Sequence, residues 1–314
     1  QRALESRSPR DLAIAFRILV ALEEPRWHHG SPSAHLRWFD EAFAHPCAAE
    51  VEPRVRVSAL IARGRVAWRV GRLDTSEADL DAAVAIAAGL GDIELESLAR
   101  RFAALVLFVR GRTEACRESA EHALRLALRA GSPRLEGMAK AMLAIEARGR
   151  GEPERACRLI EEALDRFAEV GDAAFELTMR IERVCAYVDA GELDAARVHA
   201  AQALALNTTL GLPPNARLLL GLAHATLEAG DPAGALLRYR ETRDAAQALG
   251  ERTLELLAAV CGAIVLFEQG RALEAQCELR DAIRSARRFG RNLYIGPVMA
   301  LLAAVEARLG HLDE

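Results

Sequence analysis

The sequence has few aromatic residues, almost no lysine and no long apolar run. Aromatic residues make up only 5% of its 314 positions, and Lys140 is the single lysine among 41 basic residues. The low aromatic content argues against a β-sandwich or barrel. Uncharged apolar runs such as 103–109 are far shorter than the roughly 20 residues that span a bilayer, and no secretory signal is visible. We therefore expect no membrane partner.

Motifs for metal, cofactor and catalytic sites are also missing. The 6 cysteines form no CxxC pair and no Cys/His cluster with zinc spacing, so we expect a reduced, cytoplasmic protein without bound metal. The chain has no P-loop, no GxGxxG after a strand, no HExxH and no GxSxG. We predict no catalytic residues, no cofactor and no enzymatic activity. The net charge of −4 gives no reason to expect direct contact with nucleic acid.

A repeat of about 40 residues dominates what is present. Glycines recur at steps of 39–41 residues, at Gly30, Gly71, Gly111, Gly151, Gly191, Gly230, Gly270 and Gly310. A second series lies halfway, at Gly91, Gly131, Gly171, Gly211, Gly250 and Gly290. Such regularity predicts tandem units, each made of one supersecondary element.

Each unit is predicted to be a helical hairpin, with helix A, a tight turn at the glycine, and helix B. Between glycines, small and apolar residues recur at i, i+3/i+4 and i+7, which is typical of amphipathic helices. Small residues stand at fixed places around the turn glycine, for example Ala104, Cys116 and Ala123 around Gly111. We interpret them as the points where neighbouring helices cross closely. Cys116 is then a small core residue.

The fold class predicted from this pattern is all-α. At these residues the chain resembles the tetratricopeptide family, and the stretch RRFAALVLFVRGRTEACRESAEHALRLALRAG matches its layout along the full motif. The 40-residue period is more similar to the C-terminal arrays of MalT-like and other LuxR-type regulators and related signal-transduction ATPases. This resemblance implies a right-handed α/α superhelix of about seven hairpins plus a terminal helix.

We expect one solenoid over residues 1–314, and the missing initial Met suggests part of something longer. The last A helix, about Tyr294 to Leu309, has no B helix after it in the sequence. Because the ends of a solenoid need a polar outer face, we expect self-association through this end. In the first repeat, Glu23 and Pro25 replace the small residues of later repeats, so its A helix should end early or kink.

The candidate site lies on the face of the A helices. Residues three, six and ten positions before each turn glycine share one helix face. The candidates for binding a ligand or partner there are Arg65, Trp68, Arg101, Leu105, Phe108, Arg148, His224 and Phe267. The aliphatic residues could equally pack between adjacent A helices. For Trp68, Phe108 and the three arginines we favour a ligand-facing role, because aromatic and Arg side chains form most interface hot spots.

The function we expect is a non-catalytic sensor or interaction array that binds a protein or peptide. The family resemblance implies that it belongs to a larger bacterial signalling or transcription regulator. Two alternatives stay open: a free-standing adaptor scaffold, and a receptor that closes its groove on a peptide or small molecule.

Overall fold

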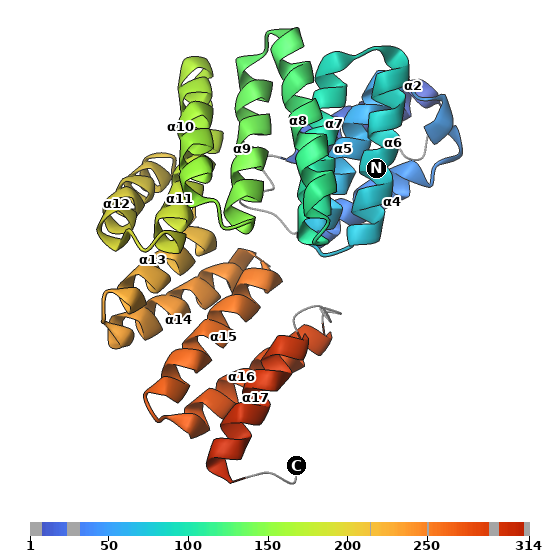
Figure 1. Cartoon of the computed structure of the whole chain (residues 1–314). Helices are drawn as coiled ribbons and strands as arrows, with labels where there is room; N and C mark the ends of the chain where they lie inside the picture. Colours follow the sequence, from blue (N-terminus) through green and yellow to red (C-terminus); the bar gives the residue numbers. More distant parts are fainter. Residues whose placement is uncertain (1–7, 24–31, 214, 250, 289–294, 311–314) are drawn as a thin grey trace. The chain divides into compact units, whose positions relative to one another are not determined.

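The chain is helical throughout the part that the computed structural model describes, namely residues 8–23, 32–213, 215–249, 251–288 and 295–310 (Figure 1). Those residues form 15 α-helices and one 3-10 helix, with no strand among them, which confirms the predicted all-α class. The helices group into two compact units, Gln1–Glu182 and Arg183–Glu314. One solenoid over 1–314 stays a prediction.

Unit 1 contains a first helix pair, three hairpins, and most of an A helix. Its elements are α2 (Pro9–Ala21), α4 (Pro32–Phe43), η1 (Pro46–Glu50), α5 (Pro53–Arg69), α6 (Leu73–Leu90), α7 (Ile93–Val109), α8 (Thr113–Ala130), α9 (Pro133–Gly149), α10 (Pro153–Val170) and α11 (Ala173–Asp189). The A helices α5, α7 and α9 pack against their B helices α6, α8 and α10. They also contact one another in series, which places their A-helix faces side by side.

Unit 2 continues the alternation, and the division between the units falls within α11. Its remaining helices are α12 (Leu193–Thr209), α13 (Ala216–Glu228), α14 (Pro232–Leu249), α15 (Arg252–Glu268), α16 (Ala272–Arg288) and α17 (Ile295–Leu309). Here α13 packs on α14, α15 on α16, and α16 on α17. Pro25 and Gly30 lie outside the described residues. Helix α2 ends at Ala21.

The turns have the backbone geometry that the glycine series predicts. Gly111 and Gly151 have φ of 74° and 75°, a left-handed conformation that is strained for residues with a Cβ. At the first of these turns, the Gly111 N–H donates to the Phe108 carbonyl and the Arg112 N–H donates to the Leu107 carbonyl. These bonds satisfy carbonyls at the end of helix A and reverse the chain into helix B.

The small residues lie at the helix crossings as predicted. Cys116 and Ala123 are fully buried, and so are their counterparts in the other units, Ala156, Ala196, Ala163 and Ala203. Gly64 shows how closely the helices approach, because a Cβ there would come within 2.9 Å of the Leu80 Cγ atom. The core of each hairpin is therefore thin, and its stability depends on close approach of the backbones.

Aspartates cap several helices, whereas Asp74 does not. The Asp92, Asp172 and Asp231 side chains accept hydrogen bonds from the backbone N–H groups of Leu95, Phe175 and Gly234. Asp74 instead lies within the first turn of α6 and pairs with Arg110.

In the described part of the chain, no helix is both long and apolar enough to cross a membrane.

Candidate functional site

The A-helix face of unit 1 brings together charged side chains from four helices and from Glu23. We use this name for Arg65 and Trp68 on α5, Arg101, Leu105 and Phe108 on α7, and Arg148 on α9, together with the two glutamates that they meet. Glu23, which follows α2, and Glu182 on α11 supply those carboxylates. Both glutamates are almost fully buried, at 5% and 2% exposure.

Arg65 is held at the α2 side of this face. Its Nη1 atom lies 2.8 Å from the Glu23 Oε2 atom. The Arg65 guanidinium also lies 4.5 Å from the centre of the Phe102 ring, in a cation–π contact. Glu23 occupies a position at which the later repeats have a small residue. This unusual glutamate is the acidic partner of Arg65.

Arg148 is held in a similar way at the α11 side. Its Nε atom lies 3.6 Å from the Glu182 Oε2 atom, which is an ion pair that exceeds hydrogen-bond distance. Glu182 occupies a helix position that is apolar in other repeats, for instance Met142 in α9. The face therefore has one Arg–Glu pair at each end.

Arg101 lies among these groups without a carboxylate partner in the described part of the chain. Its residue exposure is 7%, and its Nε atom is buried without a hydrogen-bond partner; among the described residues the guanidinium makes no ion pair. It lies 4.4 Å from the centre of the Phe102 ring and 6.0 Å from that of Phe175. Burial, and secondly the positive charge of Arg65, lower the pKa of Arg101 to about 9, while Glu182 acts in the opposite direction. The guanidinium still carries its charge at pH 7.

The predicted aromatic and aliphatic members of this face are half-buried. The Phe108 ring lies over the last turn of α9, where a Cβ on Gly149 would come within 2.5 Å of the Phe108 Cε2 atom. Leu105 packs against the core beneath α7 and α9. Trp68 keeps part of its surface exposed. Phe108 and Leu105 thus combine packing between A helices with an exposed edge, and direct contact of the Trp68 and Phe108 rings stays a prediction.

His224 and Phe267 belong to unit 2, where the same face is apolar. The His224 ring meets the Tyr239 ring edge-on at 5.6 Å, and burial lowers the pKa of His224. Phe267 packs against the core of α13, α15 and α17. No described arginine occupies the corresponding positions in this unit.

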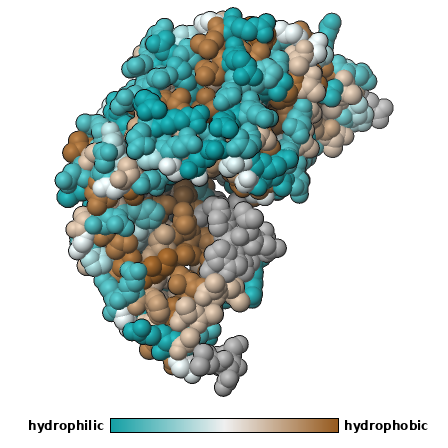
Figure 2. Space-filling view, in the orientation of Figure 1, coloured by the Kyte–Doolittle hydropathy of each residue, from teal (hydrophilic) through white to brown (hydrophobic). Residues whose placement is uncertain are grey.

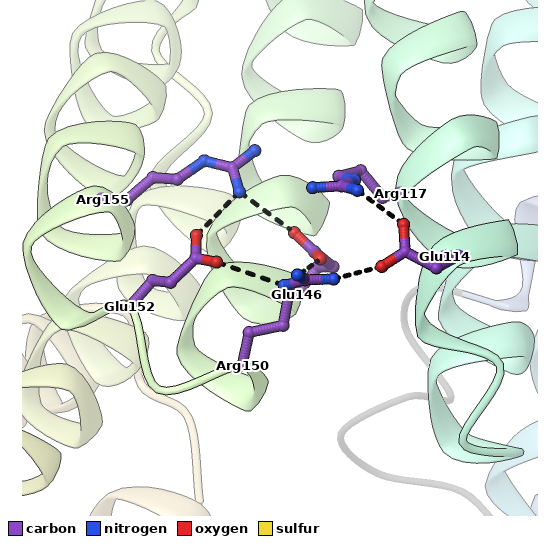
Figure 3. Close-up of polar contacts among 6 residues, drawn as sticks. All are labelled: Glu114, Arg117, Glu146, Arg150, Glu152 and Arg155. Atoms are coloured by element: carbon purple, nitrogen blue, oxygen red, sulfur yellow. Dashed lines mark hydrogen bonds and ion pairs between the residues drawn. The ribbon is translucent and has the colours of Figure 1, made fainter.

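A second charged cluster, which the sequence analysis missed, lies at the turn between α9 and α10 (Figure 3). Glu146 is fully buried, with carboxylate oxygens 3.6 Å from Arg150 Nε and from Arg155 Nη1. Arg150 also reaches Glu114 on α8 and Glu152. Burial raises the pKa of Glu146 against the lowering effect of Arg155. The cluster ties α8, α9 and α10 together, and we assign it to the fold.

The cysteines and histidines in the described part of the chain form no metal-binding group. No set of three His, Cys, Asp or Glu side chains there could hold a metal ion. Cys116 is fully buried, and burial raises the pKa of its thiol to about 12. It fills a helix crossing.

Comparisons with known proteins bear on the fold. Neither a protein-family model nor a curated protein matches the sequence. Solved structures do match. A Rap protein complexed with competence and sporulation factor aligns over 97% of this chain and 88% of its own length, with TM-score 0.67 and 11% identity. NprR in complex with its cognate peptide NprX aligns over 92% and 88%, with TM-score 0.62 and 14% identity.

A third matching structure contains tetratricopeptide repeats, the repeat family that the sequence resembles. A signal-transduction ATPase with a tetratricopeptide repeat sensor, from Pyrococcus horikoshii, aligns over 98% of this chain and 48% of its own length, with TM-score 0.59 and 14% identity. The chain therefore has a tetratricopeptide-like repeat fold.

Proposed function

We propose that this chain is a non-catalytic interaction array that binds a peptide or an extended protein segment on the A-helix face of unit 1. The observation that carries the proposal is buried Arg101, which has no ionic partner among the residues that the structure describes, on a face that also presents half-exposed rings. Trp68 and Phe108 supply apolar contact area, while Arg65, Arg101 and Arg148 supply charge. Aromatic and Arg side chains around one partly desolvated site are the usual composition of an interface hot spot.

The structural comparisons support a peptide as the class of ligand. Of the matching proteins, the Rap protein was solved in complex with competence and sporulation factor, and NprR was solved with its cognate peptide. Their identity to this chain is 11% and 14%, so they support the fold directly and the ligand class only by analogy. The location of the site depends on the residues of this chain.

The setting we propose is a cytoplasmic bacterial signalling or transcription regulator, similar to MalT-like and other LuxR-type proteins, in which this array is the sensor. The ATPase from Pyrococcus horikoshii, whose repeats are called a sensor, supports this setting. A free-standing adaptor and a small-molecule receptor are the alternatives. In unit 2, His224 and Phe267 are proposed as part of a separate, apolar contact surface.

The test is selection of peptides from a displayed library of random dodecapeptides, followed by titration of the selected peptides. Trp68→Ala and Phe108→Ala should each weaken binding by about 1–3 kcal/mol while leaving helicity intact. Arg284→Ala is the control, because Arg284 is exposed on α16 and pairs with Asp281 one turn away. Peptides that bind equally well to all of these variants would show that the A-helix face of unit 1 is not the docking surface.

A further inference from the structure

We propose that Arg101 is the anchor for a carboxylate of the bound segment, so that the ligand of this array is an acidic peptide. This inference rests on the proposed function and names the chemistry that the same face would select. The carboxylate would enter between the Arg65–Glu23 pair and the Arg148–Glu182 pair and receive hydrogen bonds from the Arg101 guanidinium.

The charged side chains named on this face carry one net positive charge, which a single anion would neutralise. Arg65, Arg101 and Arg148 carry three positive charges, whereas Glu23 and Glu182 carry two negative ones. Glu23 is 2.8 Å from Arg65 and Glu182 is 3.6 Å from Arg148, so the excess charge resides on Arg101. A single carboxylate would neutralise this excess. A phosphate group, with a charge of about −1.5 to −2 at pH 7, would leave the site negative.

The fold itself does not require an arginine at this position. The matching residues of the neighbouring A helices are Ile61, Ala141 and Ile181, and all three are buried and apolar. Removing an unpaired charge from water is costly unless an opposite charge accompanies it. Arg101 therefore lowers the stability of the free chain, and a ligand that supplies the missing charge would recover that stability.

The surroundings of Arg101 would strengthen an incoming carboxylate contact. Phe102 and Phe175 lie 4.4 Å and 6.0 Å from the guanidinium and restrict the approach of water. A charged hydrogen bond is stronger in such surroundings than in bulk solvent. Phe102 also contacts the Arg65 guanidinium, so this ring lies against both cations.

The first measurement separates a binding role of Arg101 from a structural one. We compare thermal unfolding of the full chain with that of Arg101→Met and Arg101→Gln. If Arg101 is a binding residue, both variants should unfold at a higher temperature than the wild type. Arg100→Met is the matched control on the same helix, since Arg100 has its own partner in Glu96 at 2.7 Å and its loss should lower the midpoint slightly. A lower midpoint for both Arg101 variants would overturn the proposal.

The second measurement tests the chemistry of the ligand. Peptides selected from the random dodecapeptide library are synthesised with a free or amidated C-terminus, and with each Asp or Glu replaced by its amide. One of these changes should weaken binding to the wild type by at least about 10-fold and should have little effect on Arg101→Met. The change that matters shows whether a side chain or the C-terminus supplies the carboxylate.

The outcomes separate this inference from the proposed function. Peptides that depend on Trp68 and Phe108 but on no carboxylate would leave the proposed function in place and overturn the role of Arg101. If the library yields no binder, N-acetyl-glutamate is the second probe, compared with chloride at equal ionic strength. Stabilisation of the wild type but not of Arg101→Met would support the carboxylate site and contradict the peptide function. No stabilisation of either would overturn both.

Discussion

The A-helix faces of the two units differ in chemistry although both units repeat the same helical hairpin. In unit 1 this face carries Arg65, Arg101 and Arg148, with buried glutamates at both ends. In unit 2 the corresponding positions hold apolar residues, such as Leu227 and Phe267, that pack on the core. Figure 2 shows hydrophobic residues over the α14–α15 part of unit 2, whereas hydrophilic residues cover most of the visible face of unit 1. The repeat therefore specifies the backbone and leaves the character of this face to the individual unit.

The turns differ between the units in the same sense. At two of the three turns of unit 1 the residue before the turn glycine is an arginine, Arg110 or Arg150, and each pairs with an acid of the preceding B helix, Glu77 or Glu114. Before Gly71 the residue is Val70. In unit 2 the residues at this place are Ala190, Ala229, Gln269 and Leu309. Since both kinds of turn have glycine at positive φ, the ion pairs are not needed to form the turn. Surface pairs of this kind contribute little to stability.

The largest effect is expected from filling a helix crossing. Ala123→Leu in unit 1 and Ala203→Leu in unit 2 each insert a bulky side chain at a fully buried position, which should destabilise the unit concerned by about 1–3 kcal/mol. All 3 tryptophans precede residue 70, so tryptophan fluorescence reports on unit 1 alone, whereas circular dichroism reports on all helices.

The two spectroscopic signals decide whether the units unfold separately. Because a repeat array is stabilised by nearest-neighbour contacts, Ala203→Leu should shift the urea transition seen by circular dichroism more than the one seen by fluorescence. Ala123→Leu should shift the fluorescence transition. Identical shifts of both signals in both variants would show that the two units unfold as one.

The next effect concerns the turn glycines. Gly151→Ala and Gly230→Ala should each destabilise the protein by about 1 kcal/mol or more, because φ is 75° and 82° at these positions. Gly89→Ala is the matched control: Gly89 lies within α6, and a Cβ there meets nothing within 4 Å. Since alanine favours helix, the control should be stabilised by roughly 0.5–1 kcal/mol. Equal melting midpoints for all three variants would contradict this account of the turns.

The smallest effect is expected at the Glu146 cluster and depends on pH. Burial raises the folded-state pKa of Glu146 above its ordinary 4.5. Between these two values the folded chain binds more protons than the unfolded chain, so this group makes the protein more stable as pH falls through that interval. Glu146→Gln should remove this gain. At pH 7 the free energy of unfolding should stay the same or rise by no more than about 1 kcal/mol.

Glu114 supplies the contrast for this measurement. Hydrogen bonds from Arg150 and Arg117 lower the pKa of Glu114. Its contribution is therefore present above 4.5 and is lost as pH falls through the lower folded-state value. Glu114→Gln should reduce stability slightly at pH 7. Urea denaturation at pH 4 to 8 measures the stability of both variants relative to the wild type. If this difference changes with pH in the same direction for both variants, the assignment of opposite pKa shifts is refuted.

Much of the fold could be predicted from the sequence because its signals are local. The turn glycines, such as Gly111, require a left-handed backbone, and the small residues, such as Ala123, recur at fixed distances from them. A helix cap is less predictable: Asp74 lies near a helix start, but a carboxylate there can equally serve an arginine of the next repeat. Arg110 takes it here.

The candidate site could be predicted only in outline. Helix periodicity placed Arg65, Arg101 and Arg148 on one kind of helix face, but periodicity contains no information on the partner of each charge. Phe102 and Phe175 were missed as neighbours of Arg101, because their positions along the helices read as ordinary core positions.

The repeating hairpin follows from local signals in the sequence, since each glycine turn and each small crossing residue acts within one repeat or between adjacent repeats. Which of the similar arginines is neutralised depends on the packing of the helices. Glu23 and Glu182 come from helices on either side of the arginines that they meet, so their pairing depends on how helices stack. Arg101 differs from Arg65 and Arg148 for this reason: the packed helices bury its guanidinium at a place that neither carboxylate fills.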